Sequence, residues 1–233
     1  MNESDRAGET SEVFETVESA SGPTPGASVV WLHGLGADGH DFEPIVPEIV
    51  VPGGLRFVFP HAPVRPVTIN AGFAMRAWYD ISALDGSPPR DSAGFEASVR
   101  GVRHLIDREI ESGFAPERVF VAGFSQGGSI ALHAGLTYPK RLAGVIGLST
   151  WLPFAERLER DRNDANASTP LLMAHGSADP VVPQAGGRAA ADRLTALGHP
   201  VEWHSYPMPH AVCPDELSDL CAWLTARLAT KPA

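Results

Sequence analysis

The segment RVFVAGFSQGGSIALHAGLTYP, which covers residues 118–139, decides the fold. Its first residues are mostly apolar, as in a strand that is buried on both faces of a parallel sheet. Small and apolar residues from 126 to 138 predict a helix, which Pro139 closes. A buried strand that leads directly into a helix is typical of an α/β domain.

The turn between this strand and this helix reads Gly123-Phe-Ser-Gln-Gly127, a G-x-S-x-G pattern. A sharp strand-to-helix turn holds its central residue in a strained backbone conformation, with the side chain projecting outward. Side chains two positions before and after it would collide, so both positions are glycine. The pattern predicts that Ser125 is a nucleophile at a helix N-terminus, where the dipole favours developing negative charge. The alternative is that Ser125 only caps the helix.

The alternation of strands and helices extends along the chain in both directions. Further strands are expected at residues 28–33, 55–60, 143–149, 171–175 and 201–206, with a half-exposed edge strand at 13–19. Further helices are expected at 41–50, 94–112, 185–197 and 214–228, with irregular structure at 61–93 and 151–169. The predicted fold is α/β, a mostly parallel central sheet with helices on both faces. Catalytic groups are expected in the turns that follow the strands.

A serine nucleophile needs a base and a carboxylate that orients it, and this type of turn delivers them in the order serine, acid, histidine. Asp179 follows the strand at 171–175, and His210 follows the strand at 201–206. We expect Ser125, Asp179 and His210 to act as nucleophile, orienting acid and general base. His33 and His175 end strands and could shape the site, but neither follows the acid. The competing carboxylates are Asp164, Asp192 and Asp215.

An ester-cleaving site of this type also needs two backbone N–H donors for the oxyanion. The first is expected from the residue after the nucleophile, Gln126. The second is expected from the loop after the early central strand, which reads His33-Gly-Leu35-Gly36. Leu35 N–H is the predicted second donor, and the alternative is that this loop is only a tight turn.

The composition bounds the classes of function. The 233 residues suffice for one large α/β domain, expected at 12–229, and the polar residues 1–11 are expected to be a disordered acidic tail. The formal net charge is −10, with six acidic residues and one arginine among the first 18 residues. This balance argues against nucleic acid as a partner and against docking on anionic lipid. The acidic charge is expected to serve solubility.

The two cysteines, Cys213 and Cys221, are too far apart along a common helix for a disulfide. There is no C-x-x-C pair to support a structural zinc site, and no metal is expected. The N-terminus lacks the apolar core of a secretory signal, and no apolar run is long enough to span a membrane. These features predict a cytoplasmic protein without integral membrane association.

Six motifs, in order along the chain, resemble the signature of the phospholipase/carboxylesterase family, which includes bacterial carboxylesterases and acyl-protein thioesterases. They are WLHGLGADGHDF (31–42), MRAWYD (75–80), GFSQGG (123–128), LSTWLP (148–153), HGSAD (175–179) and MPHAV (208–212). The resemblance spans residues 13–229 and implies an α/β-hydrolase fold with the same triad and oxyanion donors. It implies an esterase or thioesterase without a cofactor, and it suggests a homodimer. The polar segment at 155–169 departs from the family pattern.

Apolar side chains flank the predicted site turns and are expected to hold an acyl chain. They are Leu35, Trp78, Phe124, Trp151, Leu152, Val182 and Met208. For each of them the alternative is ordinary core packing.

The sequence therefore predicts a serine carboxylesterase that hydrolyses carboxylic esters or thioesters through an acyl-enzyme on Ser125 and favours short-to-medium acyl chains. The substrate is expected to be a small-molecule ester or thioester. An acyl-protein thioesterase or a lysophospholipase is the alternative within the family, and a peptidase or lactone hydrolase is the alternative on the same fold. A catalytically inactive binding module would need a lost triad member or oxyanion glycine, and all of these are present.

Overall fold

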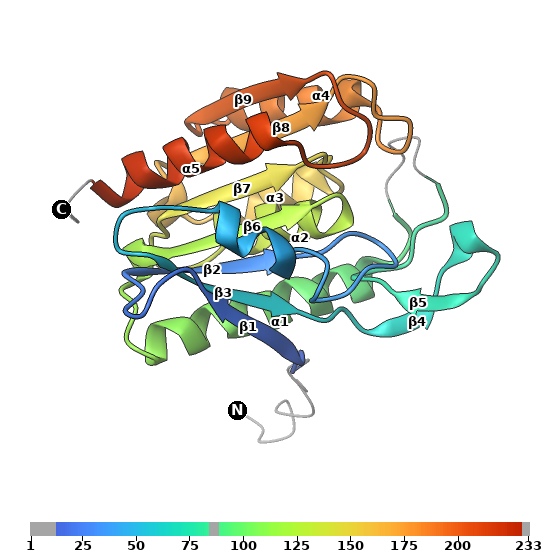
Figure 1. The fold of residues 1–233 in the computed structure, drawn as a ribbon. Helices are drawn as coiled ribbons and strands as arrows, with labels where there is room; N and C mark the ends of the chain where they lie inside the picture. Colours follow the sequence, from blue (N-terminus) through green and yellow to red (C-terminus); the bar gives the residue numbers. More distant parts are fainter. Residues whose placement is uncertain (1–12, 84–88, 230–233) are drawn as a thin grey trace, which may run out of the picture.

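A seven-stranded sheet forms the centre of the molecule, in the order β1-β3-β2-β6-β7-β8-β9 (Figure 1). The structure is a computed structural model that describes residues 13–83 and 89–229. The strands are β1 (Thr16–Ala20), β2 (Ala27–Leu32), β3 (Leu55–Pro60), β6 (Val119–Phe124), β7 (Gly144–Leu148), β8 (Leu171–Gly176) and β9 (Val201–Tyr206). Only the edge strand β1 pairs antiparallel in this sheet. The predicted mostly parallel sheet is confirmed, and the predicted tail at 1–11 lies outside the described residues.

Both faces of the sheet are buried, because successive strand side chains point to opposite sides. In β2, Val29 and Trp31 belong to one core cluster, and Val30 and Leu32 belong to another. Helix α5 (Pro214–Ala229) and the 3-10 segment Glu43–Glu48 pack on the first face (Figure 1). The second face carries α1 (Ser92–Glu111), α2 (Gln126–Leu136), α3 (Ala155–Asp161) and α4 (Gln184–Ala196). The prediction of helices on both faces is therefore confirmed.

Helix α2 is the most deeply placed of these helices. All eleven of its residues are buried, against β6, β7, β2 and helix α1. It has no solvent face, so it carries no Asp, Glu, Lys or Arg, and its polar side chains Gln126, Ser129 and His133 form hydrogen bonds inside the protein. The serine turn that starts this helix is thus anchored in the core.

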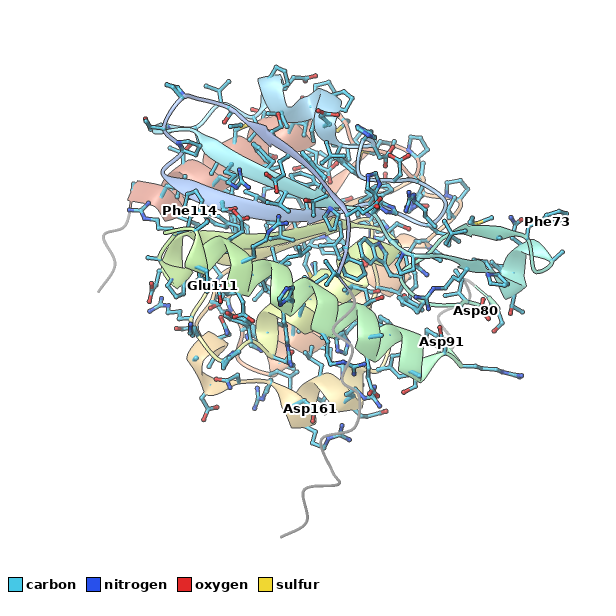
Figure 2. The ribbon with its side chains drawn as sticks, turned by 90° about the horizontal axis from the view of Figure 1, so that it is seen from below. Phe73, Asp80, Asp91, Glu111, Phe114 and Asp161 are labelled. Atoms are coloured by element: carbon cyan, nitrogen blue, oxygen red, sulfur yellow. The ribbon has the colours of Figure 1, made fainter. Side chains whose placement is uncertain are left out.

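Three predicted segments differ from the structure. The region expected to be irregular at 61–93 contains a hairpin of β4 (Val64–Pro66) and β5 (Ala74–Arg76), with the 3-10 turn Thr68–Asn70 between them. Its tip carries the exposed Phe73, which projects from the body of the molecule (Figure 2). The helix expected at 41–50 is only the 3-10 segment Glu43–Glu48, because Pro44 and Pro47 lack the N–H groups that an α-helix needs.

The segment expected to be irregular at 151–169 contains helix α3 and a 3-10 turn at Asp164–Asn166, and another short 3-10 turn at Pro116–Arg118 leads into β6. Cys213 and Cys221 are free thiols, as expected. Within the described residues, no helix combines the length and apolar character that crossing a bilayer requires.

Glu216, in the first turn of α5, is a buried carboxyl group that the predicted chemistry does not use. Burial raises its pKa from 4.5 to about 8, against a smaller opposing effect of the Cys213 backbone N–H. A carboxyl group whose pKa is higher in the folded chain binds more protons there than in the unfolded chain. Its contribution to the free energy of unfolding is therefore lost as the pH rises from 4.5 towards 8.

We predict that Glu216→Gln stabilises the protein selectively at high pH. The free energy of unfolding of the variant, minus that of the parent, should increase by on the order of 4 kcal/mol between pH 4.5 and pH 8. Urea unfolding of both proteins across this range measures the difference. Burial lowers the pKa of His33 and His133 to about 4, so both destabilise the fold in acid, but they do so equally in the two proteins and cancel. Parallel pH curves for the two proteins would contradict the prediction.

Candidate active site

Ser125 occupies the strained position of the turn between β6 and α2. Its backbone has φ 54° and ψ −121°, in the region that favours glycine. Hydrogen bonds hold this conformation: Ser125 N–H donates to Leu148 O at 2.9 Å, and Ser125 O accepts from Gly128 N–H at 3.0 Å and from Thr150 Oγ1 at 2.7 Å. The backbone conformation of the turn therefore places the side chain of Ser125 at the carboxyl edge of the sheet.

The glycines of this turn are required by close backbone approach. A Cβ atom at Gly123 would lie 2.6 Å from Gly128 N, and one at Gly127 would lie 2.6 Å from Leu32 O. Both distances are below the approach that real Cβ atoms make, and the atoms met are backbone atoms that cannot move aside. Glycine at 123 thus lets the end of β6 pack against the start of α2, and glycine at 127 lets the turn pack against the end of β2.

Asp179 and His210 come from the loops after β8 and β9 and meet at the same edge. His210 Nδ1 lies 2.6 Å from Asp179 Oδ2. The other carboxylate oxygen, Oδ1, accepts from the backbone N–H groups of Val181 at 2.8 Å and Val182 at 2.9 Å. The side chain of Asp179 is fully buried, and that of His210 is 15% exposed. The carboxylate is fixed on both oxygens, so it holds the imidazole with Nε2 free to face the site.

His175 lies behind this pair. Its Nε2 is 2.9 Å from Val182 O and 3.4 Å from Asp179 Oδ2, so it carries a proton, because both neighbours are acceptors. Burial lowers the pKa of His175, so the ring is neutral and adds no competing positive charge beside Asp179. Gly187 of α4 has no side chain where the ring stands, since a Cβ atom there would overlap Nδ1. His175 therefore supports the turn that carries Asp179.

A buried network fixes the loop after β2 against the start of α2. The side chain of Gln126 accepts from Trp78 N–H at 2.9 Å and donates to Tyr79 O at 2.8 Å. The indole N–H of Trp78 donates to His33 O at 2.8 Å, and His33 Nε2 accepts from Ala62 N–H at 3.1 Å. Burial keeps His33 neutral, with its pKa lowered to about 4. These bonds hold the two predicted oxyanion donors on adjacent loops.

Neither predicted donor is used elsewhere. Within the described residues, no hydrogen bond is made by the backbone N–H of Leu35 or of Gln126. Gly36, with φ 79°, turns the chain directly after Leu35 and donates to Arg76 O at 2.9 Å. Both free N–H groups belong to residues that line one cavity.

That cavity has a volume of about 280 Å³ and is mostly apolar. It brings together Ser125, His210 and both predicted oxyanion donors. Its lining residues are Gly34, Leu35, Ala37, Asp41, Ile81, Phe124, Ser125, Gln126, Trp151, Val181 and His210. The ring of Phe124 packs 4.7 Å from that of His210, centre to centre. Within the described residues, no three metal-binding side chains gather to form a metal site.

Three of the seven predicted substrate-binding residues line the cavity: Leu35, Phe124 and Trp151. The other four are not among its lining residues. Trp78 is fully buried and its indole N–H donates to His33 O, and Leu152 is partly buried against the cluster formed by α2, α3, α4, β7 and β8. Val182 and Met208 are buried; the backbone N–H of Val182 donates to the Asp179 carboxylate, and Met208 O accepts from Ala178 N–H.

Sequence reasoning missed four residues that line the cavity: Ala37, Asp41, Ile81 and Val181. Ile81 and Val181 lie within two residues of motif positions 80 and 179, and that proximity is the signal that could have found them. Asp41 is the cavity's carboxyl group, and its pKa is raised by burial and by neighbouring Asp38. The competing carboxylates Asp164, Asp192 and Asp215 are all exposed and line no part of this cavity.

Comparison with known proteins gives a consistent result. The family model described as Phospholipase/Carboxylesterase matches residues 13–228. Acyl-protein thioesterase 1 of Gibberella zeae is 39% identical over 218 residues, which cover 88% of this chain and 92% of that protein. Acyl-protein thioesterase 1 of Neurospora crassa is 40% identical over 215 residues, or 87% of each chain.

Solved structures agree with the sequence relatives. The crystal structure of Zea mays acyl-protein thioesterase 2 has a TM-score of 0.81 and 34% identity, and covers 93% of this chain and 100% of that one. Arabidopsis thaliana SOBER1 has a TM-score of 0.82 and 36% identity, over 87% of this chain and 99% of that one. The fold is thus that of the α/β-hydrolases, and the chain belongs to the phospholipase/carboxylesterase family of serine hydrolases.

Proposed function

We propose that this serine hydrolase is a carboxylesterase that cleaves carboxylic esters or thioesters through an acyl-enzyme on Ser125. The observation that carries the proposal is the pairing of His210 with the buried Asp179, 2.6 Å apart, at a cavity that Ser125 also lines. A nucleophile, a base and an orienting carboxylate are the groups that two-step acyl transfer requires.

In the first step, Ser125 Oγ attacks the carbonyl carbon and His210 Nε2 accepts the hydroxyl proton. Asp179 keeps the other imidazole proton on Nδ1 and stabilises the positive ring that forms. The negative charge on the carbonyl oxygen is met by the N–H groups of Leu35 and Gln126, which need no rearrangement. When the C–O or C–S bond breaks, His210 returns its proton to the departing alcohol or thiol.

In the second step, water replaces the leaving group. His210 removes a proton from the water, whose oxygen attacks the acyl-enzyme, and the same two N–H groups stabilise the second oxyanion. Collapse of this intermediate breaks the bond to Ser125 Oγ, which regains its proton from His210. The products are a carboxylic acid and the unchanged enzyme.

The cavity supports short-to-medium acyl chains. At about 280 Å³ it lies near the lower limit of small-molecule sites. Leu35, Ile81, Phe124 and Trp151 supply apolar surface, so each methylene that fits adds up to about 0.8 kcal/mol of binding. A chain that outgrows the cavity gains nothing further.

The second candidate is a thioesterase acting on acylated protein. It is favoured by the relatives named acyl-protein thioesterase, which match this chain over 87–88% of its length. An S-acyl peptide and an O-ester with the same acyl group separate the candidates: the thioesterase should show the higher kcat/KM on the peptide.

We predict that Ser125→Ala abolishes turnover while the fold is retained. The kcat for a short-chain ester should fall by at least about 10⁴-fold, and labelling by a fluorophosphonate probe should disappear. Thermal unfolding should change little, because the backbone bonds that hold the turn remain. Ser168→Ala, at an exposed position, is the matched control. Full activity in the Ser125 variant would refute the proposal.

We predict that Asp179→Asn lowers kcat by about 10³- to 10⁴-fold, because an amide in that place no longer fixes the imidazole tautomer. Asp192→Asn, at an exposed carboxylate on α4, should leave kcat unchanged. Steady-state kinetics of the two variants on one ester make the comparison. Equal losses in both variants would show that Asp179 is not the orienting acid.

We predict that kcat/KM for a homologous series of esters rises by up to about fourfold per methylene, and then levels off or falls. Trp151→Ala should move the maximum to a longer acyl chain by enlarging the cavity. Val50→Ala, at a residue that is 74% exposed, is the control and should leave the profile in place. A maximum that stays fixed in the Trp151 variant would exclude this residue from acyl-chain selection.

A further inference from the structure

A second cavity, of about 320 Å³, lies between α1, α2 and α3 and shares no lining residue with the catalytic cavity. Four arginines line it: Arg100 and Arg103 from α1, and Arg157 and Arg160 from α3. In the view from below, Asp161 at the end of α3 lies beside the long helix α1 (Figure 2). This concentration of positive charge stands out in a chain whose net charge is −10.

The acidic side chains of the lining do not balance the arginines. Glu96 pairs with Arg157 and lies 3.9 Å from Arg100. Asp161 pairs with Arg160 at 2.7 Å. Four guanidinium groups and two carboxylates leave the lining with a net charge of +2.

Arg103 is hydrogen-bonded to Thr137, the residue that follows α2. Its Nη2 donates to Thr137 O at 2.9 Å and to the hydroxyl oxygen of the same residue. Its buried Nε has no hydrogen-bond partner within the described residues. Burial lowers the pKa of Arg103, against the opposing effects of Asp161 and Asp107. A bound anion would give this buried guanidinium group the hydrogen bond and the opposite charge that water does not supply.

Apolar and neutral side chains complete the lining. Phe95 and Val99 from α1 present hydrocarbon surface. His133 is buried and neutral, with its pKa lowered to about 4, and its Nε2 donates to Pro153 O at 2.7 Å. A ligand here would therefore meet arginines on one part of its surface and apolar atoms on another.

We propose that this cavity binds a small phosphate monoester, with its phosphate on the arginines and a short apolar group against Phe95 and Val99. A phosphate monoester carries a charge of about −1.5 to −2 at pH 7, which matches the lining, whereas a carboxylate carries only half of it. The planar guanidinium fork also suits phosphate oxygens in a bidentate arrangement. The volume is that of a small-molecule site.

Calorimetric titration of the intact chain tests the ligand class, with butyl phosphate, inorganic phosphate and hexanoate at one ionic strength. We expect saturable binding of butyl phosphate with a Kd of about 1 mM or tighter, at least about fivefold tighter than either comparison ligand. No saturation up to about 20 mM butyl phosphate would overturn the proposal. If hexanoate bound as tightly as butyl phosphate, the proposed preference for a doubly charged phosphate would be wrong. If inorganic phosphate bound as tightly as butyl phosphate, the proposed contact of the apolar group with Phe95 and Val99 would be wrong.

Variants that should weaken butyl phosphate binding, and one that should tighten it, together locate the site. Arg103→Met and the exposed Arg100→Met should each weaken butyl phosphate binding by about tenfold, whereas Glu96→Gln should tighten it because it removes a competing carboxylate. Arg188→Met on α4, whose arginine pairs with exposed Asp192, is the matched control and should change nothing. Equal weakening by the control, or no tightening in the Glu96 variant, would show that binding is elsewhere. Turnover of an uncharged ester should stay constant in all four variants, which separates this site from the proposed catalytic one.

Discussion

The whole site depends on one steric constraint, the close backbone packing of the β6–α2 turn, which touches the start of α2 at Gly123 and the end of β2 at Gly127. Only glycine fits at positions 123 and 127, because a Cβ atom at either place would meet fixed backbone atoms. In the same turn Ser125 has φ 54°. Strain of this kind costs of the order of 1–3 kcal/mol and persists only where surrounding structure imposes it. Here it is imposed by a helix with no exposed residue and by hydrogen bonds with the end of β7 and the loop that follows it.

Hydrogen bonds between buried polar groups then fix the positions of the site residues at the edge of the sheet. Gln126 ties the start of α2 to the chain at Trp78 and Tyr79, and Trp78 ties that chain to His33. On the other side, Asp179 is held by two backbone N–H groups, with His175 behind it. Each group would be costly to bury alone, so the network is stable only when it is complete. The proposed oxyanion donors and the Asp179–His210 pair are positioned by these bonds before any substrate arrives.

The sequence predicts structural elements correctly where a residue pattern is compatible with only one kind of element. The strands before Ser125 and Asp179 are apolar runs that end in turns, whereas the strand before His210 mixes polar and apolar residues. The hairpin at Val64–Arg76 and helix α3 were missed, because three-residue strands and a seven-residue helix are too short to show a period. Trp78 was expected to hold the acyl chain, but it is not among the residues that line the cavity. Apolar type and proximity to a motif do not tell whether a side chain faces the cavity or the core, and here the hydrogen bond of the indole N–H decides.

The complete burial of α2 also bears on how this enzyme can change during evolution. A helix without a solvent face offers no position where a substitution is neutral, so the nucleophile cannot drift relative to the sheet. Variation in substrate range must instead accumulate in the surrounding loops, where Ala37, Ile81, Trp151 and Val181 reach the cavity from four separate segments. Each of those segments can mutate independently of the others, so new specificities can be acquired while the reacting atoms stay in place.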